Sequence, residues 1–108
     1  MDGAYLATPR SDAENAFIVG LQPDQNIWIG INDIGQEGKF ISVDGDDVSY
    51  TRWAKNPVQQ PDNAFGGENG VHIIGAPGWG SPTFWNDNKI DREYQFVCFY
   101  RIQGELLP

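Results

Sequence analysis

Cysteine is nearly absent from this chain, which holds a single one, Cys98, among 108 residues. A lone cysteine has no partner for an internal disulfide, so packing and hydrogen bonds must hold the fold together. We interpret Cys98 as a small, buried apolar side chain of the last strand rather than as a reactive thiol. Long apolar runs are also lacking, and we therefore expect no insertion into a membrane.

Basic residues are few, with 7 Lys and Arg against 15 Asp and Glu, and the formal net charge is −8. A surface this acidic disfavours nucleic acid and anionic membranes as partners. It suits a protein that binds cations.

Catalytic motifs are missing as well. The only histidine, His72, has no serine or cysteine nucleophile placed beside it by a motif. The sequence contains no Gly-rich phosphate loop and no acids paired as in a catalytic site. We therefore expect a binding protein and not an enzyme, and we interpret His72 as a structural or surface residue.

Apolar residues make up 40% of the chain and include four Trp, six Phe and four Tyr, which indicates one globular domain. Ser11 and Glu14 form a capping-box pattern at the start of a helix, and Pro23 ends it. The side chains that we expect this helix to pack on the core follow at helical spacing: Ala13, Ala16, Phe17 and Leu21.

Alternating apolar residues predict a strand at residues 27–31. Residues 40–43 and 48–50 flank an acidic turn at 44–47, which we interpret as a hairpin because Asp-Gly favours such turns. An EF-hand loop is excluded because Lys55 stands where its last glutamate ligand belongs. Further along, we predict a strand at residues 71–74 inside a long loop region, and a last strand at residues 95–102.

Oxygen-bearing side chains gather in the loop region and just after it. They comprise three carboxylates and two amides: Gln60, Asp62, Glu68, Asn86 and Asp87. Calcium takes six to eight oxygen ligands in flexible geometry, whereas zinc prefers sulfur and imidazole. The set therefore indicates Ca²⁺ as the cofactor.

Gln60-Pro61-Asp62, Glu68 and Trp85-Asn86-Asp87 resemble the calcium and sugar site of C-type lectin domains. Four further stretches extend the resemblance, in the family's order, over nearly the whole chain: residues 3–15, residues 28–40 with the pattern WIGI and Glu37-Gly38, Tyr50-Thr51-Arg52-Trp53, and Phe96-Val97-Cys98.

The resemblance implies an α+β fold with mixed antiparallel sheets, one recognisable helix and long calcium-binding loops. Residues 1–102 would form the domain and residues 103–108 a tail or linker. The family's N-terminal strand and helix have no counterpart here, and Gly70 and Ile90 stand where one of its disulfides belongs. Because the last strand then lacks its usual neighbour, we expect another chain, a symmetry mate in a homo-oligomer, or residues 1–6 to cover its edge.

The resemblance also assigns ligands. Gln60, Asp62, Glu68, Asn86 and Asp87 would hold one calcium, and the Gln60–Pro61 bond would be cis. A second, auxiliary calcium site would use Asp33, Glu37, Asn63, Glu68 and Asn69.

In the family, two adjacent sugar hydroxyls complete the calcium shell. Gln60, Asp62, Glu68 and Asn86 would also hydrogen-bond the sugar, and Gln-Pro-Asp resembles the galactose-type order. Ala64 stands where galactose-binding relatives place a stacking Trp, which leaves Phe65 and Trp79 as substitutes. We expect calcium-dependent binding of galactose-type glycans by a secreted or cell-surface protein, in the manner of an adhesion module. The alternative is a lectin-like module that binds protein or ice without binding sugar.

Overall fold

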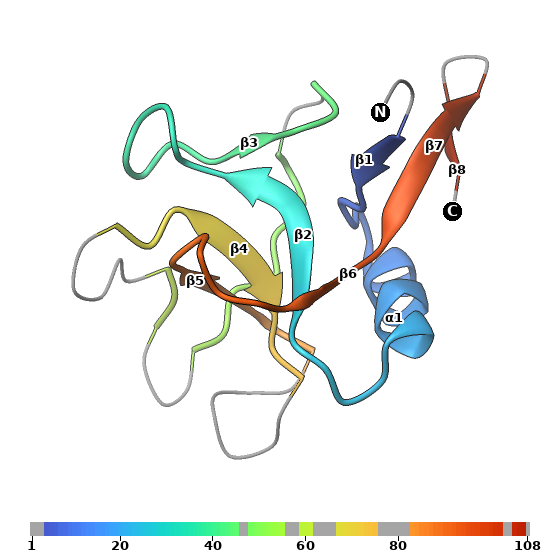
Figure 1. The fold of residues 1–108 in the computed structure, drawn as a ribbon, viewed down its shortest axis with the longest axis horizontal. Helices are drawn as coiled ribbons and strands as arrows, with labels where there is room; N and C mark the ends of the chain where they lie inside the picture. The colour runs from blue at the N-terminus through green and yellow to red at the C-terminus, as the bar shows by residue number, and fades with distance from the viewer. Residues whose placement is uncertain are drawn as a thin grey trace.

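The computed structural model describes residues 4–45, 48–55, 59–61, 67–75, 83–102 and 105–107. In this part of the chain, one helix packs against two β-sheets (Figure 1). The first sheet has the order β1 (Ala4–Leu6), β7 (Cys98–Ile102), β8 (Glu105–Leu107). The second has the order β3 (Ile41–Ser42), β2 (Ile27–Asn32), β4 (Gly70–Ile73), β5 (Trp85–Asn88), and β6 (Gln95–Phe96) pairs in parallel with β2. The expected α+β architecture is confirmed.

The predicted helix is present as α1 (Asp12–Leu21), and its cap differs from the expected one in one bond. The Ser11 hydroxyl accepts a hydrogen bond from the Glu14 amide at 3.1 Å, as the capping box requires. Glu14 does not reach back to Ser11, because its Oε1 accepts from the backbone amide of Arg10 at 3.1 Å. The cap therefore also fixes the chain that enters the helix.

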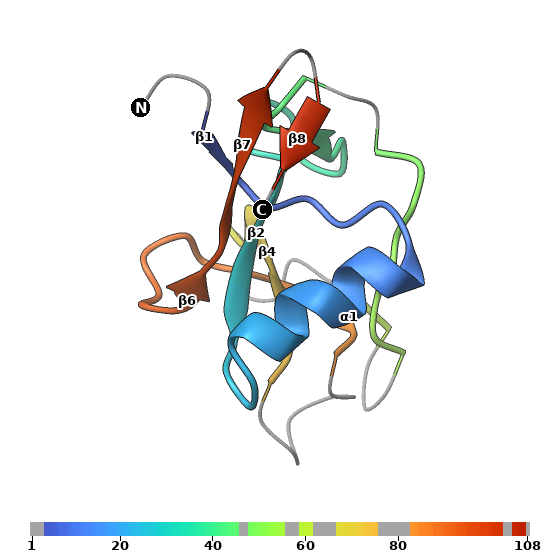
Figure 2. The same cartoon turned by 90° about the vertical axis from the view of Figure 1, so that its right-hand side faces the viewer.

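The predicted buried face of α1 is wrong. Phe17 and Leu21 are 49% and 48% exposed, and Ala13 and Ala16 are exposed as well. The helix α1 lies beside β2 and β4 (Figure 2). Its buried residues are Ile18 and Asn15, which are 0% and 2% exposed. The amide of Asn15 satisfies its hydrogen bonds inside the protein, and this is why a polar residue can occupy a core position.

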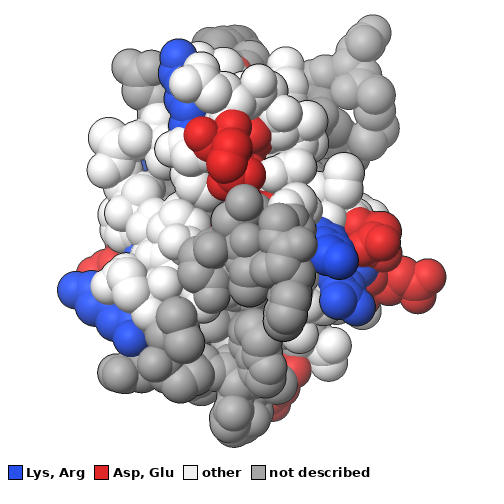
Figure 3. Space-filling model, turned by 90° about the vertical axis from the view of Figure 1, so that its left-hand side faces the viewer, with Lys and Arg blue, Asp and Glu red and all other residues white. Residues whose placement is uncertain are grey.

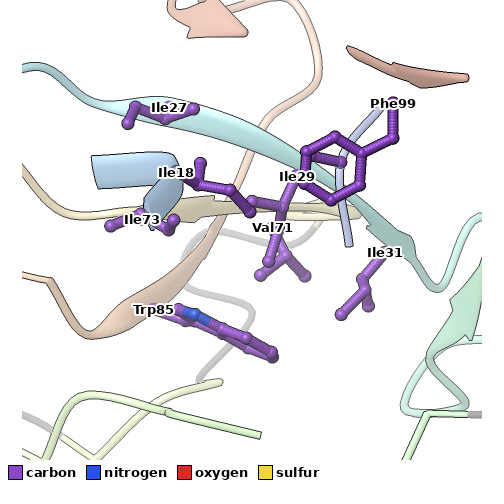
Figure 4. Close-up of a cluster of buried hydrophobic side chains, with 9 residues drawn as sticks. Ile18, Ile27, Ile29, Ile31, Val71, Ile73, Trp85 and Phe99 are labelled. Atoms are coloured by element: carbon purple, nitrogen blue, oxygen red, sulfur yellow. The ribbon is translucent and has the colours of Figure 1, made fainter. Parts of the chain in front are cut away.

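The two partners of Asn15 lie beside and within β5. Its Oδ1 accepts from the indole Nε1 of Trp85 at 2.9 Å, and its Nδ2 donates to the carbonyl of Thr83 at 3.0 Å. Trp85 is fully buried at the base of the core (Figure 4). The rest of this cluster is apolar and comes from both sheets and the helix: Ala7, Ile18, Ile27, Ile29, Ile31, Val71, Ile73 and Phe99.

The hairpin expected around residues 44–47 is wrong in its second arm. Gly45 turns the chain with φ +90°, and its amide donates to the Ser42 carbonyl at 3.2 Å. Residues 48–50 form no strand, and residues 46–47 lie outside the described part of the chain. Instead β3 pairs antiparallel with β2, so β2 supplies the hydrogen bonds that the second arm was expected to provide.

The last strand, predicted as one element over residues 95–102, is divided between the two sheets. β6 pairs with β2 and β7 pairs with β1, and Val97 lies at the crossing. The Val97 carbonyl accepts from the Ala7 amide at 2.7 Å, which continues the pairing of β1 with β7, and the Gly30 amide of β2 donates to the Ala7 carbonyl at 2.9 Å, which joins the two sheets. Sequence alternation runs through the crossing unbroken, and therefore gives no sign of it.

Both edges of β7 are paired within the chain, by β1 on one side and β8 on the other (Figure 2). Of the three ways in which this edge was expected to be covered, the N-terminal segment folding back is the one observed. The C-terminal residues, expected to form a tail or linker, contribute β8.

Gly70 and Ile90, which replace a cysteine pair of the resembling family, lie next to each other. A Cβ added to Gly70 would stand 3.1 Å from a methyl carbon of Ile90 and 2.7 Å from the Trp28 ring. The indole of Trp28 thus occupies the space beside Gly70, and any side chain at Gly70 would displace it.

Candidate functional site

The site is built around β4 and β5, which pair antiparallel so that His72 faces Asn86 and Val71 faces Asp87. Asn86 and Asp87 are polar, yet they are 1% and 0% exposed. Burial of an amide and a carboxylate side by side is unfavourable unless both have partners. Two polar side chains buried in the centre of a core strand make this strand a candidate for a functional site.

Gln60 is brought to the same region by a loop. The Gln60–Pro61 bond is cis, as predicted, and Gln60 is buried. Its amide donates to the Ala54 carbonyl at 2.8 Å, and the Ala54 amide donates to the Trp85 carbonyl at 2.9 Å. Two successive hydrogen bonds thus tie Gln60 to the strand that carries Asn86.

Glu68 and Asn69 lead into β4. Glu68 is buried, and its charge adds to the effect of burial in raising the pKa of Tyr94. The Asn69 carbonyl accepts from the Asp33 amide at 3.1 Å, which holds the start of β4 against the loop after β2. The structure therefore brings together parts of both expected calcium sites.

Asp33 and Glu37 share a hydrogen bond at this edge, and the charge of Asp87 acts on Glu37. Asp33 is 1% exposed; its Oδ2 accepts from the Gly38 amide at 2.9 Å, while no described residue donates to its buried Oδ1. A hydrogen bond with Asp33 raises the pKa of Glu37, and partial desolvation and the charges of Asp33 and Asp87 raise it further. Acidic side chains also group together on the face shown in Figure 3. Carboxylates this close repel one another, and a cation would relieve the repulsion.

The donors fit calcium, because every side chain expected to bind the ion offers an oxygen. Within the described ranges, no three Asp, Glu, His or Cys side chains form a ready metal cluster. Three of the expected ligands that are described are amides: Gln60, Asn86 and, in the auxiliary site, Asn69. The expected site residues that lie outside the described part of the chain are Asp62, Asn63, Phe65 and Trp79.

His72 is a residue of the site that sequence reasoning missed. It is 1% exposed, and burial lowers its pKa to about 4, although a hydrogen bond with the Ile73 carbonyl opposes this shift. Its Nε2 lies 3.1 Å from Nδ2 of Asn86. Burial excludes the surface interpretation of His72. Its contact with Asn86 depends on the register of β4 against β5, which the sequence does not reveal.

No helix in the described ranges is both long and apolar enough to cross a membrane.

Comparisons with known proteins agree with this geometry. A family model described as the Lectin C-type domain matches residues 1–100. The chain is 31% identical over 102 residues to Lectin BRA-3 of Megabalanus rosa, covering 94% of this chain and 59% of that protein. It is 38% identical over 100 residues to the alpha-N-acetylgalactosamine-specific lectin of Patiria pectinifera, covering 87% and 56%.

Among solved structures, the C-type lectin CEL-I from Cucumaria echinata matches with a TM-score of 0.72 and 33% identity. The match covers 88% of this chain and 66% of that one. The chain therefore spans less than two thirds of the length of these relatives. With the family model matching nearly all of it, the chain belongs to the C-type lectin domain family.

Proposed function

We propose that this chain is a calcium-dependent carbohydrate-binding domain that acts outside the cell. Gln60, Asp62, Glu68, Asn86 and Asp87 hold one calcium ion, and the first four of these residues also contact the sugar. The observation that carries the proposal is the burial of Asn86 and Asp87 on β5, beside the carboxylates of Asp33 and Glu37. The carboxylates of these residues repel one another, and a bound cation would relieve this repulsion, as expected of a cation site.

Bound calcium supplies a positive centre that accepts sugar hydroxyl oxygens as ligands. The side chains hydrogen-bond the sugar hydroxyls. The carboxylates of Glu68 and Asp62 accept hydrogen bonds from sugar hydroxyl hydrogens, and the amides of Gln60 and Asn86 donate to hydroxyl oxygens. The order of acid and amide along the chain therefore selects the hydroxyl geometry that fits.

We also propose an auxiliary calcium site at Asp33, Glu37, Asn63, Glu68 and Asn69. The buried Oδ1 of Asp33 supports it, because no described residue donates to this oxygen. The raised pKa of Glu37 supports it too, because a hydrogen bond with Asp33 and the nearby negative charges of Asp33 and Asp87 contribute to it, and a cation would relieve that crowding. Two of the five side chains are amides, and a site with fewer charges binds calcium more weakly.

Galactose-type glycans are the ligands that we propose. The order Gln60 then Asp62 supports this choice, and so does the similarity to a relative named for specificity toward alpha-N-acetylgalactosamine. Ala64 offers no ring to stack on the sugar, so selectivity rests mainly on hydrogen bonds. Phe65 and Trp79 are the aromatic residues that we propose as substitutes.

A glycan array tests the function directly. The purified chain is applied in millimolar calcium, in magnesium, and in chelator. We expect binding to terminal galactose and N-acetylgalactosamine in calcium alone. If the chain is folded by circular dichroism and binds no glycan under any condition, the sugar-binding proposal is wrong and a lectin-like module for protein or ice becomes the better explanation.

A further inference from the structure

His72 and Asn86 form a buried contact between neighbouring strands. The ring stands on β4 directly opposite Asn86 on β5, and both residues are 1% exposed. Nδ1 of the ring lies 3.2 Å from the Ile73 carbonyl, and Nε2 lies 3.1 Å from Nδ2 of Asn86. Both ring nitrogens thus have a partner inside the protein.

The identity of the first partner decides where the proton lies. A carbonyl oxygen can only accept, so Nδ1 must carry the hydrogen that is donated to Ile73. In a neutral imidazole the other nitrogen is then an acceptor, and Nε2 offers a lone pair toward Asn86. Only the NH₂ end of the Asn86 amide can donate to that lone pair. The amide oxygen Oδ1 must therefore lie at the end turned away from His72.

Aromatic rings hold the imidazole in this position. Trp28 packs edge-on to His72 with ring centroids 5.8 Å apart, and Tyr94 packs at a tilt with centroids 4.6 Å apart. The Tyr94 hydroxyl accepts from Nδ2 of Asn88 at 2.9 Å, which fixes the tyrosine in turn. This apolar enclosure disfavours a charged imidazolium, which would have no lone pair for Asn86.

We propose that His72 is a positioning residue, which holds the Asn86 amide with Nδ2 toward the histidine and leaves Oδ1 for the calcium ion. This inference rests on the proposed function, in which Asn86 is a calcium ligand. Calcium binds an amide through its oxygen, so an amide turned the other way would present NH₂ to a cation. The second Nδ2 hydrogen stays available to donate to a sugar hydroxyl.

The first test is spectroscopic and needs no calcium. Nitrogen-15 chemical shifts of the imidazole, measured at neutral pH in chelator, report which ring nitrogen carries hydrogen. We expect Nδ1 to carry the hydrogen and Nε2 to be unprotonated and to accept a hydrogen bond. A hydrogen on Nε2 would require Asn86 to present its oxygen to the ring, and that result overturns the proposal.

The second test compares calcium affinity by isothermal titration in three variants. His72→Leu removes the acceptor, and outer partners of metal ligands typically change affinity about 10–100-fold, so we expect at least a tenfold loss. His72→Gln can still accept from Asn86 through its side-chain oxygen and should recover much of that loss. Phe17→Ala, on the exposed face of α1, is the control and should bind calcium like the parent.

Melting curves in chelator show which variants are folded. A folded His72→Leu variant with the parent's calcium affinity overturns the positioning role and leaves the proposed function intact. Absence of calcium binding in the parent itself overturns the proposed function, and the positioning role with it. If His72→Leu does not fold, the nitrogen-15 shifts of the parent decide the matter.

Discussion

Asn15 should be one of the most stabilising residues of the helix, although its polar side chain suggests the opposite. Asn15→Ala removes the acceptor for the indole hydrogen of Trp85, which is 0% exposed and has no access to water. A buried donor left without a partner costs about 1–3 kcal/mol. The Thr83 carbonyl suffers less, because Nε of Arg52 also donates to it at 3.3 Å.

Two smaller contributions complete the estimate. The void left by the amide costs about 1 kcal/mol, and the better helix propensity of alanine returns about 0.5 kcal/mol. Together these values predict a loss of roughly 1.5–3.5 kcal/mol in the free energy of unfolding. Urea denaturation in chelator measures this loss apart from any effect of calcium.

A double-mutant cycle isolates the Asn15–Trp85 bond. In the Trp85→Phe background the indole donor is already gone, so Asn15→Ala should cost about 1–2 kcal/mol less than in the parent. Phe17→Ala serves as the control on the exposed face of α1, and it should cost less than Asn15→Ala. If Asn15→Ala changes stability by under about 0.5 kcal/mol, or if the cycle shows no coupling, the reasoning about the buried face is refuted.

Three further predictions follow from single positions. Burial lowers the pKa of His72 from 6.5 to about 4, so between these pH values the unfolded chain binds a proton that the folded chain does not bind. The free energy of unfolding should therefore fall by about 3 kcal/mol as the pH drops from 6.5 to 4. Urea denaturation at several pH values should show this fall in the parent and not in His72→Gln. Gly75→Ala should prevent stable folding, because the added Cβ would stand 1.9 Å from a backbone oxygen. Gly20→Ala, whose Cβ would meet nothing within 4 Å, should raise the melting temperature slightly, and equal melting temperatures of the two variants would contradict this packing. The double variant Gln60→Glu, Asp62→Asn exchanges acid and amide but keeps the number of ligands and the net charge. Its calcium affinity, measured by titration, should stay similar, while a glycan array should show a preference shifted toward mannose-type sugars. An unchanged glycan profile would mean that these residues do not select the sugar.

Local signals in the sequence were sufficient for much of the fold. The capping residue Ser11, the alternation in β2 and the apolar residues of β4 each depend on near neighbours, and each is found where the sequence predicts it. The cis bond before Pro61 came from the family resemblance, since a proline in isolation favours trans.

Long-range partners explain what the sequence could not predict. Asn15 is buried because Trp85, 70 residues away, offers a donor. The strand pattern is interrupted at Val97 because the residues before it pair with β2 in one sheet and the residues after it pair with β1 in the other. His72 belongs to the site only through the pairing of β4 with β5. In each case the deciding residue is distant in sequence, and no local pattern refers to it.

The measurement that tests the central claim most directly is a calcium titration of stability. Extracellular calcium modules have dissociation constants of about 10⁻⁴–10⁻³ M, so 10 mM calcium should add roughly 1.4–2.7 kcal/mol to the free energy of unfolding. We expect the melting temperature to rise by several degrees in calcium, to fall back in chelator, and to respond less in Asp87→Asn. A melting curve that is the same in calcium, magnesium and chelator would contradict a calcium site at these residues.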